Sequence, residues 1–247
     1  MQPTDRAFVS GAFITHEIIT EPYNYAEAIS RADAPIWELA MQSEIDQHCE
    51  IGMWELVDLP PGWDAVGCRW VYAAKIKPNR EFEKGKARVV AQGFTQRPEM
   101  DYYDITSPVV KFDSLQLLLA IANNLDWEIQ MMDMKGAFLN SNLMEEIYMY
   151  QPEGFNDKSG RVLKLHQALY GLKQASRAWH QRLRDTLLDL GYAQSSADEC
   201  VYVRKPGLNI EIISVYIDDL GLFANSVEGM NNIKRELNKK FVMTWER

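Results

Sequence analysis

The sequence is poor in cysteine, because its 247 residues contain only Cys49, Cys68 and Cys200. An odd number of widely spaced cysteines excludes a disulfide framework and the close ligand spacing of a zinc site, and it favours a reducing compartment. No apolar run approaches the roughly 20 residues of a membrane helix, and residues 1–10 lack the basic and then apolar pattern of a secretory signal. We therefore expect a soluble globular protein without a membrane partner, and 47% hydrophobic residues suffice for one large or two small domains.

An overall excess of basic residues is absent as well, because the formal net charge is −9. At first sight this charge argues against a nucleic-acid partner, whose phosphates require Lys and Arg. The acidic residues are concentrated at the start, however, since residues 1–68 hold twelve acidic and two basic residues, a net charge of −10. Residues 69–97 hold eight basic residues against Glu81 and Glu83, a net charge of +6. The overall charge therefore hides a basic segment that suits phosphate.

The segment Tyr216-Ile217-Asp218-Asp219 lies between two apolar runs, Ile210 to Val215 and Leu220 to Ala224. Tight hairpin turns favour Asn-Gly, Asp-Gly or Gly-Gly, and adjacent carboxylates repel each other, so an acidic turn here requires an explanation. A solvated acidic turn is the usual explanation for a short Asp-Asp pair. The alternative is a hard dication such as Mg²⁺, which takes carboxylate oxygens together with substrate phosphates. The apolar flanks indicate buried strands that present the turn, and they favour the metal site.

Hydrophobic periodicity and capping residues predict several helices and strands. Asp33 and Pro35 start a helix whose apolar face ends at His48, which we interpret as packed rather than metal-bound. Strands over Arg69–Lys77 and Lys86–Phe94 form a hairpin that carries most of the basic segment, either as a solubility device or as a mobile finger that contacts phosphate. The other predicted elements are an extended or partly disordered lead-in over 1–34, a strand over 128–134, and helices over 114–125, over 175–190 and from 225 or 226 onward.

Asp133 lies within the largely apolar strand expected over residues 128–134. A carboxylate buried there without a partner would destabilise the fold by several kcal/mol. The residue is therefore expected to be paired, bound to metal or placed at the exposed end of the strand. The strand pattern alone leaves these alternatives open.

Four longer motifs follow one another along the chain. They are Lys86-Ala87-Arg88-Val89-Val90-Ala91-Gln92-Gly93-Phe94-Thr95-Gln96, Met132-Asp133-Met134-Lys135-Gly136-Ala137-Phe138-Leu139-Asn140, Leu169-Tyr170-Gly171-Leu172-Lys173-Gln174-Ala175-Ser176-Arg177-Ala178-Trp179 and Tyr216-Ile217-Asp218-Asp219. In this order they closely resemble the reverse transcriptase of copia-type LTR retrotransposons. The resemblance runs from about Trp37 to Phe241, which is most of the chain.

The resemblance implies an α+β right-hand polymerase fold. Residues 35–247 would form the fingers and a palm whose antiparallel sheet is backed by helices, and the thumb is lacking. By position in the motifs, Asp133 matches the first catalytic aspartate, and Asp218 and Asp219 match the hairpin pair, so these residues are expected to meet on neighbouring strands. Together they would hold two Mg²⁺ ions for nucleotidyl transfer to a primer 3′-hydroxyl. The implied activity is that of an RNA-directed DNA polymerase, with an RNA or DNA template, its primer and deoxynucleoside triphosphates as partners.

The same resemblance implies further site residues. Phe138 matches the residue under the sugar that excludes a 2′-hydroxyl. Gln174 resembles the fingers-helix residue beside the incoming nucleotide. Arg88 resembles the arginine that contacts the nucleotide phosphates, and Lys86 would be a second phosphate contact.

The sequence departs from the family pattern at four positions, none of them a metal ligand: Gly136, Ser141, Ser176 and His180. After Phe241 it shows no primer-grip strand, thumb or ribonuclease H domain, and protease and integrase signatures are absent, which predicts a polyprotein fragment or the remnant of a decayed copy. Two functions stay open: a polymerase domain, or a catalytically inert remnant that binds nucleic acid. Either would bind primer-template weakly and in a salt-dependent way. The resemblance also implies a cytoplasmic location in a virus-like particle.

Overall fold

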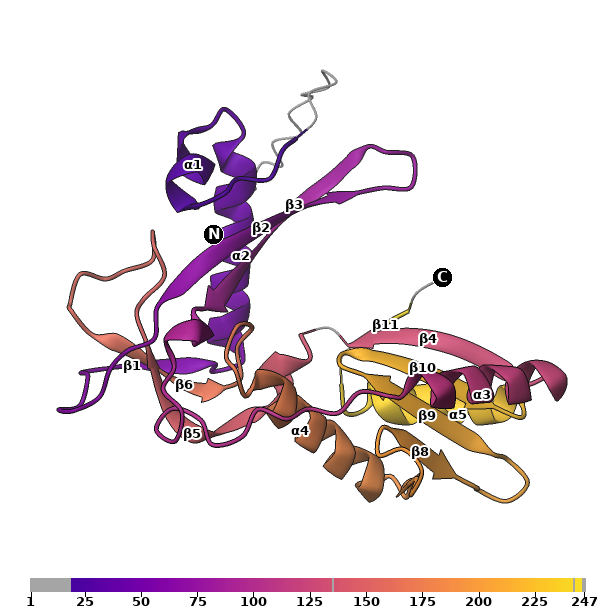
Figure 1. Ribbon diagram of the computed structural model, residues 1–247. Coiled ribbons are helices and arrows are strands. Elements are labelled where there is room, and N and C mark those ends of the chain that lie inside the picture. Colours follow the sequence, from indigo (N-terminus) through magenta and orange to yellow (C-terminus); the bar gives the residue numbers. More distant parts are fainter. Residues whose placement is uncertain (1–18, 135, 242, 246–247) are drawn as a thin grey trace, which may run out of the picture.

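The computed structural model of the protein describes residues 19–134, 136–241 and 243–245 (Figure 1). Its α-helices are α1 (Tyr25–Ser30), α2 (Ala34–Glu50), α3 (Phe112–Asn124), α4 (Ala175–Asp189) and α5 (Val227–Asn238), and its 3-10 turns are η1 (Gly93–Thr95) and η2 (Phe138–Asn140). Its strands are β1 (Trp54–Val57), β2 (Cys68–Ile76), β3 (Phe82–Ala91), β4 (Glu128–Met134), β5 (Asn142–Met149), β6 (Val162–Gln167), β7 (Ala193–Gln194), β8 (Val201–Arg204), β9 (Glu211–Tyr216), β10 (Asp219–Ala224) and β11 (Met243–Trp245).

A six-stranded antiparallel sheet in the order β11-β4-β10-β9-β8-β7 forms the larger part of the protein. Alternate residues of a strand point to opposite faces, so Leu220, Leu222 and Ala224 of β10 share one face, and all three are buried. Helix α5 covers this face, because Gly229 packs against Ala224. Figure 1 shows α3 in front of the sheet and α5 behind it. The sheet therefore has helices on both sides, which agrees with the α+β class expected from the sequence.

The hairpin of β2 and β3 forms a sheet of its own, and α2 packs against it. Gly85 of β3 allows the close approach, because a Cβ atom at this position would lie 2.8 Å from Ile36 and 3.3 Å from Trp37. Trp37, Met41 and His48 are buried, as the apolar spacing of the helix predicts. The expected β-hairpin and the expected packed role of His48 are both confirmed.

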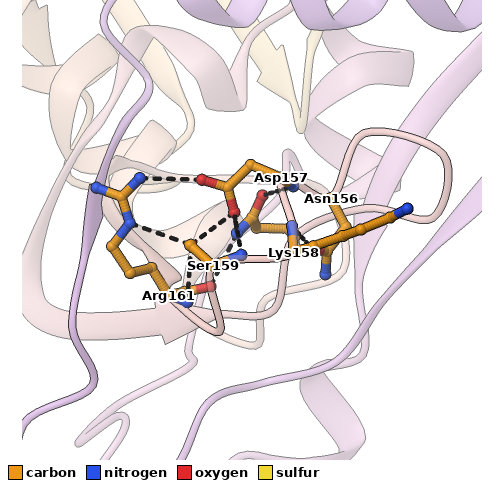
Figure 2. Close-up of polar contacts among 6 residues, drawn as sticks. Asn156, Asp157, Lys158, Ser159 and Arg161 are labelled. Atoms are coloured by element: carbon orange, nitrogen blue, oxygen red, sulfur yellow. Dashed lines mark hydrogen bonds and ion pairs between the residues drawn. The ribbon is translucent and has the colours of Figure 1, made fainter.

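A second small sheet in the order β1-β6-β5 lies beside α2 and joins the hairpin to the rest of the chain. The loop between β5 and β6 is closed by its own polar contacts (Figure 2). Asp157 accepts hydrogen bonds from Ser159 Oγ at 2.6 Å and from Arg161 at 2.9 Å. Hydrogen bonds from Ser159, and then from Gln151, hold the pKa of Asp157 well below its usual range. This exposed acid therefore has a structural explanation, because it closes the loop.

Several boundaries differ from those expected from the sequence. The prediction of an extended lead-in is wrong for residues 25–30, because they form α1. Residues 1–18 of the lead-in lie outside the described part of the chain. Helix α3 begins at Phe112 rather than after a Ser114 cap; its N-cap residue is Lys111, whose backbone N–H donates a 2.9 Å hydrogen bond to Asp198. Strand β3 begins at Phe82, so the hairpin loop is shorter than expected.

Within the described residues, no helix combines the length and the apolar character that crossing a membrane requires.

Candidate active site

Asp133 and Asp219 lie opposite each other on neighbouring strands of the six-stranded sheet. They are register partners in the antiparallel pairing of β4 with β10. The backbone N–H of Met134 donates a 3.1 Å hydrogen bond to the carbonyl oxygen of Asp218, which brings the turn of the β9–β10 hairpin to the end of β4. The expected meeting of Asp133 with the hairpin pair on adjacent strands is thus confirmed. Both Asp133 and Asp219 are half-buried, so their carboxylates lie at the margin of the core.

The turn that carries Asp218 is short and conformationally unusual. Tyr216 pairs with Asp219, so Ile217 and Asp218 alone connect the two strands. Ile217 has φ +58°, a backbone region that β-branched residues rarely adopt. Such a residue costs about 1–3 kcal/mol and persists only where the surroundings fix it. One fixing contact comes from α4, where Trp179 Nε1 donates a hydrogen bond to the Ile217 carbonyl.

The β2–β3 hairpin carries four basic residues on one face. Lys84, Lys86 and Arg88 alternate along β3 and therefore point to the same side, and Lys75 pairs across the hairpin with Lys84. On the opposite side of β3, Ala87 and Val89 are buried, and the exposed Glu83 lies near the hairpin loop. The basic residues thus form a row, which we call the basic row: Lys75, Lys84, Lys86 and Arg88.

Within the basic row, Lys86 and Arg88 are half-buried, whereas Lys75 and Lys84 are exposed. Burial lowers the pKa of Lys86, and the neighbouring charge of Arg88 lowers it further. Glu44 of α2 lies close to both cations, and burial raises the pKa of its carboxyl. The half-buried end of the row is therefore crowded with positive charge that an anion would relieve.

Phe138 lies in η2, shortly after β4, and its side chain is 9% exposed. Its ring contacts the ring of Tyr170 at a centroid distance of 4.7 Å. Arg88 lies over the other ring, with its Cζ atom 5.0 Å from the Tyr170 centroid. Phe138 and Arg88, which the sequence motifs assigned to the nucleotide, thus both contact Tyr170. The sequence analysis gave Tyr170 no role.

Gln174 is 1% exposed, and its side-chain amide is engaged inside the protein. Its Nε2 atom donates to the carbonyl oxygen of Asp101 at 2.9 Å, and its Oε1 atom accepts a 3.0 Å hydrogen bond from Gln96. Gln96 in turn accepts from the backbone N–H of Lys173. The structure therefore gives Gln174 a place that fixes the loop before α4. Its direct contact with a nucleotide stays a prediction.

The donors at the end of β4 suit a divalent cation by their chemistry, since carboxylate oxygens are hard ligands. Asp133 and Asp219 share one face of the sheet, and Asp218 stands next to them on the turn. Across the described part of the chain, no group of three or more His, Cys, Asp or Glu side chains is arranged closely enough to hold a metal ion. The donor types therefore fit a divalent cation, and binding one would require the carboxylates to come closer together.

A hollow of about 560 Å³ lies between α2 and the segment after β4. Leu39, Gln42 and Asp46 of α2 line one side, and Gly136 and Asn140 line the other. None of the site residues expected from the sequence lines it. The hollow therefore lies next to the site residues and is not formed by them.

Sequence reasoning missed the parts played by Tyr170, Trp179 and Gln96. Tyr170 and Trp179 belong to the same motif as Gln174, and Gln96 ends the motif that contains Arg88. Their contacts join segments far apart in the chain, and no periodic pattern reveals such contacts. An unassigned aromatic residue inside a long motif was the one signal available.

Comparison with known proteins agrees with this geometry. A family model described as "Reverse transcriptase (RNA-dependent DNA polymerase)" matches residues 51–245. The Retrovirus-related Pol polyprotein from transposon RE1 of Arabidopsis thaliana is 39% identical over 208 residues, which are 83% of this chain and 14% of that protein. The corresponding polyprotein from transposon TNT 1-94 of Nicotiana tabacum is 35% identical over 241 residues, which are 96% of this chain and 18% of that protein.

Among solved structures, a foamy viral protease-reverse transcriptase in complex with double-stranded DNA gives a TM-score of 0.42 at 15% identity, over 83% of this chain and 30% of that one. The chain spans less than a fifth of the length of the two Pol polyproteins. The family model covers most of the chain, and the resemblance seen in the sequence motifs is confirmed. This chain belongs to the reverse transcriptase (RNA-dependent DNA polymerase) family.

Proposed function

We propose that this chain is the RNA-directed DNA polymerase domain of a retrotransposon polyprotein. Its substrates would be deoxynucleoside triphosphates and a primer paired with an RNA or DNA template. The observation that carries the proposal is the pairing of Asp133 with Asp219 beside the turn of Asp218, within the palm of a reverse transcriptase family member. A cytoplasmic location in a virus-like particle stays a prediction.

Reverse transcriptases generally use divalent metal ions, and we assign their binding here to Asp133, Asp218 and Asp219 as ligands of two Mg²⁺ ions. When bound, the ions would activate the primer 3′-hydroxyl and stabilise the leaving pyrophosphate. Strand register fixes the backbones of Asp133 and Asp219 side by side, and the two-residue turn places Asp218 next to them. Asp218 is the ligand whose position depends on the strained backbone of Ile217.

The remaining residues would bind and orient the nucleotide. Arg88 offers two parallel N–H donors to a phosphate, and Lys86 offers a point charge beside it. Phe138, which lies shortly after the strand of Asp133, would stand under the sugar and exclude a 2′-hydroxyl. Gln174 would hold the loop before α4 in place. Any hydrogen bond from its amide to the nucleotide would replace its hydrogen bond to Gln96 or Asp101.

Primer extension tests the proposal. Wild-type protein is incubated with a primed RNA template, Mg²⁺ and all four deoxynucleotides, next to the Asp218→Asn variant. We expect extension by the wild type and none above background by the variant. Asp126→Asn is the matched control, because Asp126 is an exposed aspartate before the opposite end of β4 and its positive φ suits asparagine.

Extension by Asp126→Asn should equal that of the wild type. A folded wild-type protein, judged by circular dichroism, that extends no primer would overturn the proposal. Equal extension by wild type and Asp218→Asn would remove the hairpin carboxylates from the metal site.

A further inference from the structure

Tyr170 lies in the loop between β6 and α4 and touches two of the proposed nucleotide-binding residues. Its ring centroid is 4.7 Å from that of Phe138, with an angle of 59° between the rings. The guanidinium of Arg88 lies over the same ring at 5.0 Å. Tilted aromatic pairs and cations above ring faces attract at these distances. One half-buried side chain therefore joins the residue assigned to the sugar with the residue assigned to the phosphates.

The backbone of Tyr170 is locked to the strand that carries Arg88. The N–H of Ala91, three residues after Arg88, donates a 2.8 Å hydrogen bond to the Tyr170 carbonyl. Gly171 has φ +91°, and a Cβ atom at this position would lie 2.1 Å from the Ala91 carbonyl oxygen. Only glycine permits this approach. The ring of Tyr170 and the guanidinium of Arg88 thus extend from two backbones in direct contact.

Tyr170 also lies within electrostatic reach of the proposed metal ligands. Burial raises the pKa of its hydroxyl, Arg88 lowers it, and the charges of Asp218 and Asp133 raise it further. The hydroxyl is therefore neutral at ordinary pH, and the side chain contacts Arg88 of the basic row.

We propose that Tyr170 is a positioning residue of the nucleotide site, which holds the Phe138 ring at the sugar and the Arg88 guanidinium at the phosphates and so helps to select deoxyribose over ribose. This inference rests on the proposed function. A ring excludes a 2′-hydroxyl only if it is held in place, and the Tyr170 ring packs directly against that of Phe138. Arg88 binds phosphate with defined geometry only if its guanidinium is held in place, and the Tyr170 ring holds it.

Single-nucleotide incorporation of dGTP and GTP tests the proposal with the variants Tyr170→Leu and Tyr170→Phe. Without the ring, in Tyr170→Leu, we expect KM for dGTP to rise about tenfold with kcat changed less than threefold, and discrimination against GTP to fall at least tenfold. With the ring restored, in Tyr170→Phe, both values should return to within about twofold of the wild type. A purely structural role would reduce the amount of active protein and leave KM and discrimination unchanged.

Two further variants sharpen the comparison. Trp63→Leu is the matched control, because Trp63 forms an aromatic pair with Tyr148 at 5.2 Å that involves none of the proposed site residues. It should leave KM and discrimination as in the wild type. In the double variant Phe138→Ala and Tyr170→Leu, discrimination should be no lower than in Phe138→Ala alone, since Tyr170 acts on the sugar through Phe138.

Unchanged KM and discrimination in an active Tyr170→Leu protein would overturn the proposal, as would an equal effect of Trp63→Leu. Titration calorimetry of dGTP and GTP into each protein with a dideoxy-terminated primer-template separates this result from failure of the proposed function. A protein that binds dGTP in preference to GTP but extends no primer would refute the polymerase activity, and the affinity ratio would still test Tyr170. A folded wild-type protein that binds neither nucleotide would overturn both.

Discussion

The indole N–H of Trp179 donates a 2.8 Å hydrogen bond to the carbonyl oxygen of Ile217, the first residue of the turn that carries Asp218. Trp179 is 1% exposed and packs edge to face on Phe241 at 5.3 Å, so the donor is held in a rigid position. Ile217 has a backbone conformation that is unfavourable for a β-branched residue. Helix α4 therefore helps to hold the hairpin turn, and with it the proposed third metal ligand, in a strained conformation.

Trp179→Phe should weaken this support while keeping an aromatic ring against Phe241. We expect the free energy of unfolding to fall by about 1 kcal/mol, the net value of one hydrogen bond. We also expect kcat for primer extension to fall about tenfold, because the loss of about 1.4 kcal/mol of transition-state stabilisation lowers a rate by that factor. The KM for primer-template should stay the same. Urea denaturation and steady-state primer extension measure the two effects.

Trp70→Phe is the control for Trp179→Phe. Trp70 is also buried, and its indole N–H donates a 2.9 Å hydrogen bond to the carbonyl oxygen of Glu153, outside the proposed site. The two variants should lose similar stability, and only Trp179→Phe should lose kcat. An equal loss of kcat in both would mean that Trp179 acts through general stability and not through the turn.

The sequence predicts the strands and helices better than it predicts their contacts. Strand β4 has the expected bounds, and α4 ends where Gly191 takes the positive φ that a helix terminus of this kind needs. Helix α1 was missed because it has only six residues, although Asn24 caps it by accepting from the N–H of Glu27, a pattern visible in the sequence. The capping signal was therefore present in the sequence, but residues 25–30 have no sustained apolar periodicity that would have indicated a helix.

In the candidate site, too, the sequence predicted the strands better than the side-chain contacts. The motif resemblance placed Asp133 beside Asp219, and the strand register bears this out. The burial of Gln174 could not be foreseen, because it depends on Gln96 and Asp101, which lie more than 70 positions away in the sequence. Tertiary hydrogen bonds of this kind leave no periodic trace in the sequence.

The basic row should set the salt dependence of primer-template binding. Each phosphate contact that a cation makes releases counterions, so removing one contact reduces the slope of log K against log salt by about 1. We expect Lys84→Ala to lower affinity at low salt and to reduce the slope by about this amount. Fluorescence anisotropy of a labelled primer-template at several salt concentrations measures both.

Lys240→Ala removes an exposed lysine after α5 and serves as the control. An equal reduction of the slope by both variants would indicate a general charge effect and would contradict a phosphate-binding row.

A buried ion pair joins strands of the six-stranded sheet to α5. Glu211 is fully buried and accepts hydrogen bonds from Arg204 Nε at 2.9 Å, from Asn232 at 2.9 Å and from Tyr192 at 3.0 Å. Glu211→Gln keeps the shape of the side chain but removes the charge that faces Arg204. We expect the free energy of unfolding to fall by about 3 kcal/mol, the lower end for breaking a buried pair, because Arg204 keeps an ion pair with Glu236.

Glu146→Gln is the matched control for Glu211→Gln, because Glu146 forms an exposed ion pair with Lys164 at 2.9 Å. Exposed pairs contribute about 0–1 kcal/mol, so this variant should lose less than 1 kcal/mol. Urea denaturation at neutral pH measures both. A loss below about 1 kcal/mol in Glu211→Gln would show that the buried network is replaceable.

His48 should make the stability of the protein depend on pH. Its side chain is fully buried against the Trp54 ring, and burial lowers its pKa to about 4. The unfolded chain, whose histidine has a pKa of about 6.5, binds the proton more readily than the folded protein between these two values. Stability is therefore highest above about pH 6.5 and falls as the pH decreases toward 4, by at most about 1.4 kcal/mol per pH unit for one proton.

His48→Gln tests this dependence because glutamine does not titrate. The charged group that faces His48 is Glu44, one turn earlier on α2, with its Oε1 atom 3.4 Å from His48 Nε2. Burial raises the pKa of Glu44, which favours the folded state as the pH falls, but both proteins contain this residue. The stability difference between wild type and His48→Gln should therefore increase with pH from about 4 to 6.5. His166→Gln, at a half-exposed histidine of β6, is the matched control, because it removes an imidazole from the surface and not from the core. A stability difference for His48→Gln that is constant over this range would show that His48 takes up a proton as readily in the folded protein as in the unfolded chain.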